Sequence, residues 1–169
     1  MDDNEKRFYD LLNELGITEF TIHEHDAIFS ADDADEKGLI MDGLNLKNLL
    51  IKDKKAGDYY MVILDDHRHM DARHFKEVAG WGKTRFANED EMWQLLKLTP
   101  GSVTPFALFN DTEKQITVVL EKQIADAEDD ELVNFHPCRN TATLSMKKRD
   151  FMKYLKSMGN KVILEKSEE

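Results

Sequence analysis

The amino-acid sequence predicts a single α/β domain in which a mixed β-sheet is flanked by helices. Its 169 residues suffice for a domain that buries roughly two-thirds of the surface exposed by the unfolded chain. Helical and strand patterns are both present but do not alternate regularly, which favours a mixed sheet over a parallel one. No internal repeat or linker rich in Pro, Gly or Ser divides the chain. We therefore expect one domain over residues 1–165 and a disordered tail over residues 166–169.

The N-terminal part is predicted to hold a helix, a strand and a second, short helix. Residues 4–15 carry apolar side chains at helical spacing and are followed by Gly16, a residue that commonly ends helices. Residues 20–23 alternate between apolar and polar side chains, as in a strand. Ser30 can cap a helix that runs toward Gly38.

The middle of the chain is predicted to begin with a β-hairpin. Residues 46–52 and 59–64 are strand-like and flank a polar segment that is typical of a turn. Residues 71–79 have the pattern of a helix, and Asn88 with Glu91 forms a capping box for the next one. These helices are expected to cover the sheet.

A second hairpin is predicted from residues 105–109 and 115–120, because Asn110-Asp111 between them favours a turn. Gly101 and Pro105 would then lie at the entry to a strand. The remaining expected elements are strands at 132–135, 141–146 and 162–164, and a helix over 151–158 that ends at Gly159.

The charge is strongly negative but unevenly distributed. The formal net charge is −11, with −10 on residues 1–46 and −8 on residues 86–134. Residues 47–85 and 135–169 carry +3 and +4. Because phosphates are bound by Lys and Arg, this pattern suits a protein that contacts the end of a nucleic acid without coating a duplex. A patchwork of solvated faces explains the same charge blocks equally well.

Cysteine content and hydropathy bear on location. Cys138 is the only cysteine and cannot form an internal disulfide. No apolar run reaches 18 residues, and no charged-then-apolar leader opens the chain. We expect a cytoplasmic protein that does not bind membranes.

Several reaction classes lack their signatures. The sequence contains no Walker phosphate loop, no Gly-x-Ser-x-Gly elbow and no paired-cysteine zinc pattern. His67, His69 and His74 form the one histidine cluster, but the neighbouring acidic residues favour a solvated loop over a metal site. No metal or organic cofactor is expected.

Three short motifs could carry chemistry. Lys47-Asn48 precedes an apolar run, so the lysine is either a phosphate ligand or a solvated lysine near a strand end. Residues 101–106, Gly-Ser-Val-Thr-Pro-Phe, form either a plain tight turn or a turn with free backbone amides. Residues 135–143, Phe-His-Pro-Cys-Arg-Asn-Thr-Ala-Thr, hold His136 beside a proline, as a structural or a functional histidine.

In their order and spacing these motifs resemble the YbaK/prolyl-tRNA-synthetase-associated editing family, and in particular its free-standing Ala-tRNA(Pro) deacylases. The resemblance extends from His25 through the C-terminal helix and implies a partly barrel-like sheet. It implies three catalytic residues, Lys47, Gly101 and His136. It further implies a set of substrate-binding residues: Asn48, Ser102, Val103, Thr104, Pro105, Asn140 and Thr141.

The implied chemistry needs no side-chain nucleophile. Lys47 would hold a terminal phosphate, the amides near Gly101 would stabilise the oxyanion, and His136 would line the pocket or contact the ribose. Cys138 is interpreted as a small filler, since nothing in the sequence indicates an activated thiol.

The resemblance implies a trans-editing hydrolase that deacylates mischarged tRNA(Pro), most readily Ala-tRNA(Pro). Its expected partner is a tRNA acceptor end carrying a small amino acid, with prolyl-tRNA synthetase as a further candidate. Two alternatives stay open: a deacylase for serine or cysteine, and a non-catalytic tRNA-binding or regulatory module with the same fold.

Overall fold

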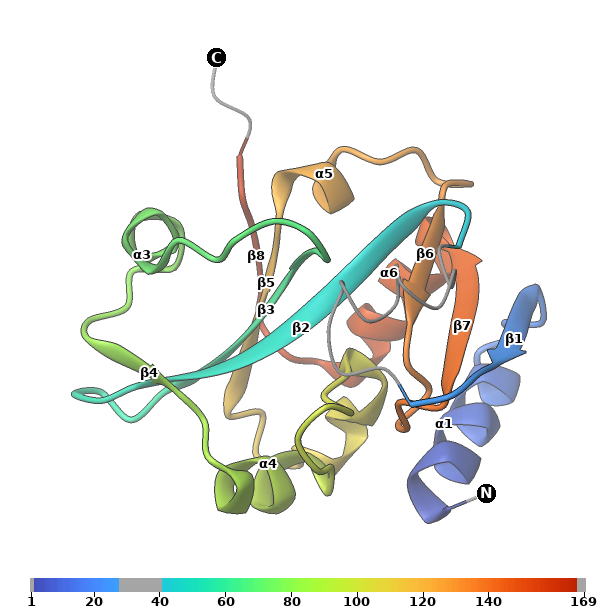
Figure 1. Ribbon diagram of the computed structural model, residues 1–169, viewed down its shortest axis with the longest axis horizontal. Helices are drawn as coiled ribbons and strands as arrows, with labels where there is room; N and C mark the ends of the chain where they lie inside the picture. The colour runs from blue at the N-terminus through green and yellow to red at the C-terminus, as the bar shows by residue number, and fades with distance from the viewer. Residues whose placement is uncertain (1, 28–40, 167–169) are drawn as a thin grey trace.

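The computed structural model describes residues 2–27 and 41–166. The helix expected from Ser30 to Gly38 and most of the expected tail lie outside these ranges. In the described part, no helix is both long and apolar enough to cross a membrane. The expected fold class is confirmed: helices flank one mixed sheet (Figure 1).

The sheet has eight strands in the order β1-β7-β6-β2-β3-β5-β8, with β4 paired to β2. Three pairs are parallel, β2–β6, β3–β5 and β5–β8, and the others are antiparallel. The strands are β1 (Phe20–Glu24), β2 (Leu44–Asp53), β3 (Tyr59–Asp65), β4 (Thr84–Phe86), β5 (Ile116–Leu120), β6 (Leu132–Phe135), β7 (Ala142–Lys147) and β8 (Val162–Leu164).

The helices begin and end where capping residues allow it. Asp2 caps α1 (Asp3–Glu14), Asp71 caps α3 (Ala72–Ala79), and the expected capping box of Asn88 and Glu91 opens α4 (Glu89–Leu96). Gly159, in the left-handed conformation, ends α6 (Lys148–Met158). The short α5 (Lys122–Ala125) follows β5.

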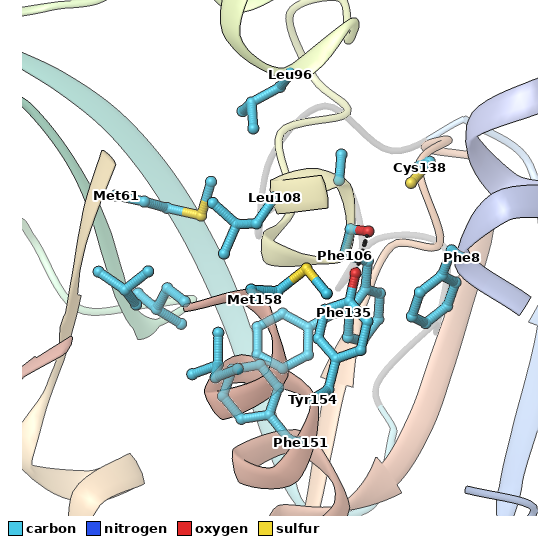
Figure 2. Packing of buried hydrophobic residues seen from close by; sticks show 14 of the residues in the cluster. Phe8, Met61, Leu96, Phe106, Leu108, Phe135, Cys138, Phe151, Tyr154 and Met158 are labelled. Carbon is cyan, nitrogen blue, oxygen red and sulfur yellow. Dashed lines mark hydrogen bonds between the residues drawn. The ribbon is translucent and has the colours of Figure 1, made fainter. Parts of the chain in front are cut away.

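The larger of two apolar clusters lies where α1 and α6 meet the sheet. Phe8 stacks on Phe106, and Phe135 stacks on Phe151 (Figure 2). The Tyr154 hydroxyl donates to the backbone oxygen of Phe106 at 2.6 Å, so the buried phenol has a partner. This packing holds residues 105–110 against α6.

The predicted strand at 105–109, and with it the second hairpin, is wrong. Residues Pro105–Asn110 form a 3-10 helix, η1, in which Pro105 takes the first turn and Thr104 accepts from the Phe106 N–H at 3.3 Å. Proline suits a first helical turn because its missing N–H would have no partner there. The apolar run is buried in a helix, and β5 pairs with β3 and β8 instead.

Candidate functional site

The candidate site lies where β2 changes partners. On the edge of β2 opposite β3, β6 pairs with Leu44 and Asn45, and β4 pairs with Ile51–Asp53. Between these ladders, residues 46–49 have no strand partner on that edge within the described ranges. The gap divides the sheet along one side of β2, and all three sequence motifs lie next to it.

Lys47 and Asn48 present their side chains on opposite faces of β2. Lys47 lies opposite Leu64 in β3, and Asn48 lies opposite Ile63, so the two residues follow the alternation of the strand. Lys47 is half-buried and is the fourth residue of β2. Among the described residues, no carboxylate forms an ion pair with its ammonium group. That group is therefore available to an anionic ligand.

Asn48 ties the loop of residues 101–105 to β2. Its Nδ2 donates to the backbone oxygen of Val103 at 3.1 Å. Its Oδ1 is buried and has no hydrogen-bond partner in the described part of the chain. A buried acceptor without a partner costs free energy, and such groups in native proteins call for an explanation such as a bound ligand.

The 101–105 loop contains both used and unused backbone donors. Gly101 has a φ of +88°, a conformation that favours glycine. The Ser102 N–H donates to the Thr99 oxygen at 3.1 Å and is therefore occupied. The N–H groups of Val103 and Thr104 have no acceptor among the described residues. These two amides, rather than that of Ser102, could stabilise an oxyanion.

His136 follows β6 at the level of Lys47. Asn45 pairs with Asn134, and Lys47 and His136 each lie two residues further along these adjacent parallel strands. The His136 Nδ1 is 2.8 Å from the Ala142 oxygen. Since a carbonyl only accepts, Nδ1 carries the proton and neutral His136 keeps a lone pair on Nε2.

The environment of His136 favours its neutral form. Burial lowers the pKa of this imidazole, the hydrogen bond to Ala142 opposes that effect, and the nearby His25 lowers the pKa further. At neutral pH, Nε2 is an acceptor for a hydroxyl group, and no described residue occupies it.

His25 is a neighbour of the site that the sequence did not single out as a site residue. Its ring centroid is 6.2 Å from that of His136. Its Nδ1 lies 2.8 Å from the Asp26 oxygen and its Nε2 lies 2.8 Å from the Thr143 hydroxyl. The only sequence signal was that the family resemblance begins at this residue.

The segment after His136 is held by ionic and polar contacts. The Arg139 guanidinium pairs with Glu5 and Glu24 and also donates to the Thr141 hydroxyl at 3.0 Å. The Thr141 oxygen accepts from the His25 N–H at 3.0 Å. Thr141 therefore connects the start of β7 to the end of β1. Asn140, the residue before it, is half-buried and also has an interaction partner.

Two further groups bear on the chemistry. Burial raises the pKa of the Cys138 thiol well above its usual range, which suits a filler and not a nucleophile. His74 pairs with Glu165 and not with other histidines. No group of three or more His, Cys, Asp or Glu side chains within the described residues is arranged to hold a metal.

Comparison with known families gives one match that spans most of the chain. The model of the aminoacyl-tRNA editing domain matches residues 25–154. The chain is 32% identical over 149 residues to the prolyl-tRNA editing protein ProX of Acetoanaerobium sticklandii, covering 88% of each sequence. It is 34% identical over 143 residues to the prolyl-tRNA synthetase associated domain-containing protein 1 of Xenopus laevis, covering 83% of this chain and 84% of that one.

Solved structures show a similar fold. One is the crystal structure of a hypothetical protein, with a TM-score of 0.70, 21% identity and coverage of 95% of this chain and 98% of the other. Another is described as a candidate trans-editing enzyme for prolyl-tRNA synthetase, with a TM-score of 0.68, 17% identity and 99% coverage of both chains. At these identities the likeness concerns the fold alone.

Proposed function

The chain belongs to the aminoacyl-tRNA editing domain family, and on that premise we propose that it is a free-standing hydrolase that removes alanine from mischarged tRNA(Pro). One observation carries the proposal: Lys47, which has no ion-pair partner among residues 2–27 and 41–166, stands beside Asn48, and Asn48 anchors a loop in which two backbone amides have no acceptor in the same ranges. The strand β2 thus carries Lys47, a cation that can bind a phosphate. Through Asn48, the same strand also holds the loop whose amides can donate to a developing oxyanion.

Each group has a role in ester hydrolysis. Lys47 binds a phosphate of the terminal nucleotide as a point charge. The amides of Val103 and Thr104, in the loop that Gly101 begins, donate to the carbonyl oxygen as it becomes negatively charged. Nε2 of His136 accepts a hydrogen bond from a ribose hydroxyl.

The reaction needs only water as a co-reactant. A bond forms between the water oxygen and the carbonyl carbon, and the bond between that carbon and the ribose oxygen breaks. The ribose oxygen gains a proton, so the products are alanine and tRNA with a free terminal hydroxyl. An aminoacyl ester is already activated, so positioning and oxyanion stabilisation suffice without a covalent enzyme intermediate.

The choice of alanine follows from the limits of binding selectivity. A synthetase pocket shaped for proline cannot strongly reject alanine, because a missing methylene is worth only about 1–3 kcal/mol. A second and smaller pocket can reject proline by steric overlap. A free-standing hydrolase with such a pocket removes the error without attacking the correct product.

A panel of Ala-, Ser-, Cys- and Pro-tRNA(Pro), offered separately to the purified protein, tests this proposal. We expect rapid loss of the alanine ester and survival of the proline ester. Fastest loss of the serine or cysteine ester would reassign the amino acid. Binding of all four species without hydrolysis would reject the enzyme and favour the non-catalytic module.

A further inference from the structure

Three exposed lysines gather where β2 ends. Lys54 and Lys55 lie in the turn between β2 and β3, and Lys83 directly precedes β4. The Lys54 N–H donates to the Lys83 oxygen at 2.8 Å, so the two segments are in contact. Within residues 2–27 and 41–166, no carboxylate forms an ion pair with any of these ammonium groups. We call Lys54, Lys55 and Lys83 the β2-tip lysines.

The backbone beneath the β2-tip lysines is fixed by Asp53. This buried carboxylate accepts from the N–H groups of Lys55, Ala56 and Gly82 at 2.9, 3.1 and 2.9 Å. The negative charge of Asp53 is therefore held by backbone donors of the β2–β3 turn and of the segment that precedes β4. Asp58, the other carboxylate of the turn, is exposed. The turn and the residue before β4 thus carry three exposed ammonium groups and one exposed carboxylate.

An exposed aromatic ring lies between this surface and Lys47. Phe86 is opposite Ile51 in the β2–β4 ladder, and Ile51 shares a face of β2 with Lys47. Phe86 is 60% exposed, although aromatic side chains normally bury most of their surface. Exposed rings of this kind can stack on unpaired bases of a nucleic acid.

The separation along β2 sets the size of a ligand that reaches both ends. At about 3.3 Å per residue, Phe86 lies about 13 Å and Lys54 about 23 Å along the strand from Lys47. Adjacent phosphates of one duplex strand are about 3.4 Å apart along the helix axis, so roughly 23 Å corresponds to several nucleotides. In Figure 1, β2 runs from β6 to β4, so a single strand connects the two places.

We propose that the β2-tip lysines bind backbone phosphates of the tRNA acceptor arm, with Phe86 stacking on an unpaired base, while the terminal nucleotide lies at Lys47. This proposal rests on the proposed function for its substrate. The chain without these lysines carries a negative net charge, so a basic surface at this end of β2 favours one orientation of the acceptor arm.

The test compares two triple variants of equal charge. One carries Lys54→Ala, Lys55→Ala and Lys83→Ala. The matched control carries Lys122→Ala, Lys153→Ala and Lys156→Ala, three exposed lysines of α5 and α6. Each is assayed with Ala-tRNA(Pro) and with the alanyl ester of adenosine 5′-monophosphate, which has no acceptor arm. Thermal melts of both variants report whether the fold is intact.

We expect the β2-tip variant to raise KM for Ala-tRNA(Pro) at least tenfold with little change in kcat, and to hydrolyse the small ester as the parent does. The slope of log KM against log salt should fall by roughly two to three, since each lost phosphate contact removes about 0.9. The control should stay within twofold of the parent. Phe86→Leu should weaken tRNA binding, and Phe86→Trp should retain it.

Two results would overturn the proposal. One is a β2-tip variant that matches the parent in KM and salt slope for the tRNA. The other is an equal loss on both substrates, which would place the effect in the catalytic pocket. If the parent hydrolyses neither substrate, the proposed function fails by itself. In that case the binding of uncharged tRNA(Pro) is measured instead. Weaker binding by the β2-tip variant alone supports phosphate binding by the β2-tip lysines, and binding equal to that of the parent rejects it.

Discussion

Asn48 holds Val103 by a hydrogen bond of 3.1 Å from its Nδ2 to the backbone oxygen, across 55 positions of sequence. The bond joins the strand that carries Lys47 to the loop whose Val103 and Thr104 amides have no acceptor in the described part of the chain. Lys47 and the anchor of this loop are therefore consecutive residues, with side chains on opposite faces of β2. Their relative position depends on β2 and not on the flexibility of the loop.

Replacing Asn48 with Ala should reduce kcat/KM about tenfold while changing the free energy of unfolding by less than about 1 kcal/mol. The loss of Nδ2 leaves the Val103 oxygen without its donor, but the loss of Oδ1 removes a buried acceptor that has no described partner. Deacylation rates and urea unfolding measure the two effects separately.

Asn160 provides the matched control for Asn48. Its Oδ1 also lacks a partner in the described part of the chain, and its Nδ2 donates to the Ile116 oxygen at 2.8 Å and to Asp111. Asn160→Ala should lower the melting temperature and leave kcat/KM of the folded protein unchanged. A similar loss of activity in both variants would remove the special role of Asn48.

Replacing Lys47 with Ala should lower kcat/KM by about 2 kcal/mol or more, equivalent to roughly thirtyfold, because it removes the charge that we propose binds a phosphate at a partly desolvated position. The fold should persist, since no described carboxylate pairs with this lysine. Kinetics at subsaturating substrate and a thermal melt test both parts. Parent-like hydrolysis by the variant would remove Lys47 from the site.

The deacylation activity should decrease at a pH below 6.5, where the His136 ring gains a proton. Burial lowers its pKa from the usual 6.5, so the neutral ring predominates above that value and the acceptor on Nε2 is lost as the pH falls through the lowered pKa. Its contribution to stability is complete above pH 6.5 and decreases below it, because the unfolded chain binds the proton more readily. An NMR titration of the His136 ring should have its midpoint below 6.5, and a midpoint at or above that value would contradict the assignment.

Glu165 should make the protein sensitive to acid. The Arg68 guanidinium, the Lys122 N–H and His74 together hold the pKa of this buried carboxyl at about 2, against 4.5 ordinarily. The stabilisation is therefore complete above pH 4.5 and is lost as the pH falls toward 2. Glu165→Gln should cost about 2 kcal/mol at pH 7 and much less at pH 3. Urea unfolding at several pH values measures this difference, and a cost independent of pH would contradict it.

The elements with a clear local signal could be predicted from the sequence. The helix expected at 4–15 is α1, because its apolar side chains repeat at helical spacing, and the hairpin at 46–64 is β2 and β3. The prediction of a strand at 105–109 failed because a short apolar segment has the same sequence pattern in a buried strand and in a buried helix. Pro105 after a capping Thr104 was the overlooked helix signal.

The candidate site came from the family resemblance more than from local patterns. Lys47, the 101–105 loop and His136 carry little specificity one by one, and their roles stay predictions. The contacts that organise them join residues far apart in sequence, such as Asn48 with Val103 and His25 with Thr143. Such pairs depend on strand order and register, which no local pattern encodes.

The most direct test of the central claim is single-turnover deacylation with the protein in excess over Ala-tRNA(Pro), run beside Pro-tRNA(Pro) and beside the Lys47→Ala variant. We expect the parent to release alanine rapidly, to leave the proline ester at its spontaneous rate of loss, and to exceed the variant on the alanine ester by at least thirtyfold. An alanine ester that survives as long with the parent as in buffer alone would contradict the editing function.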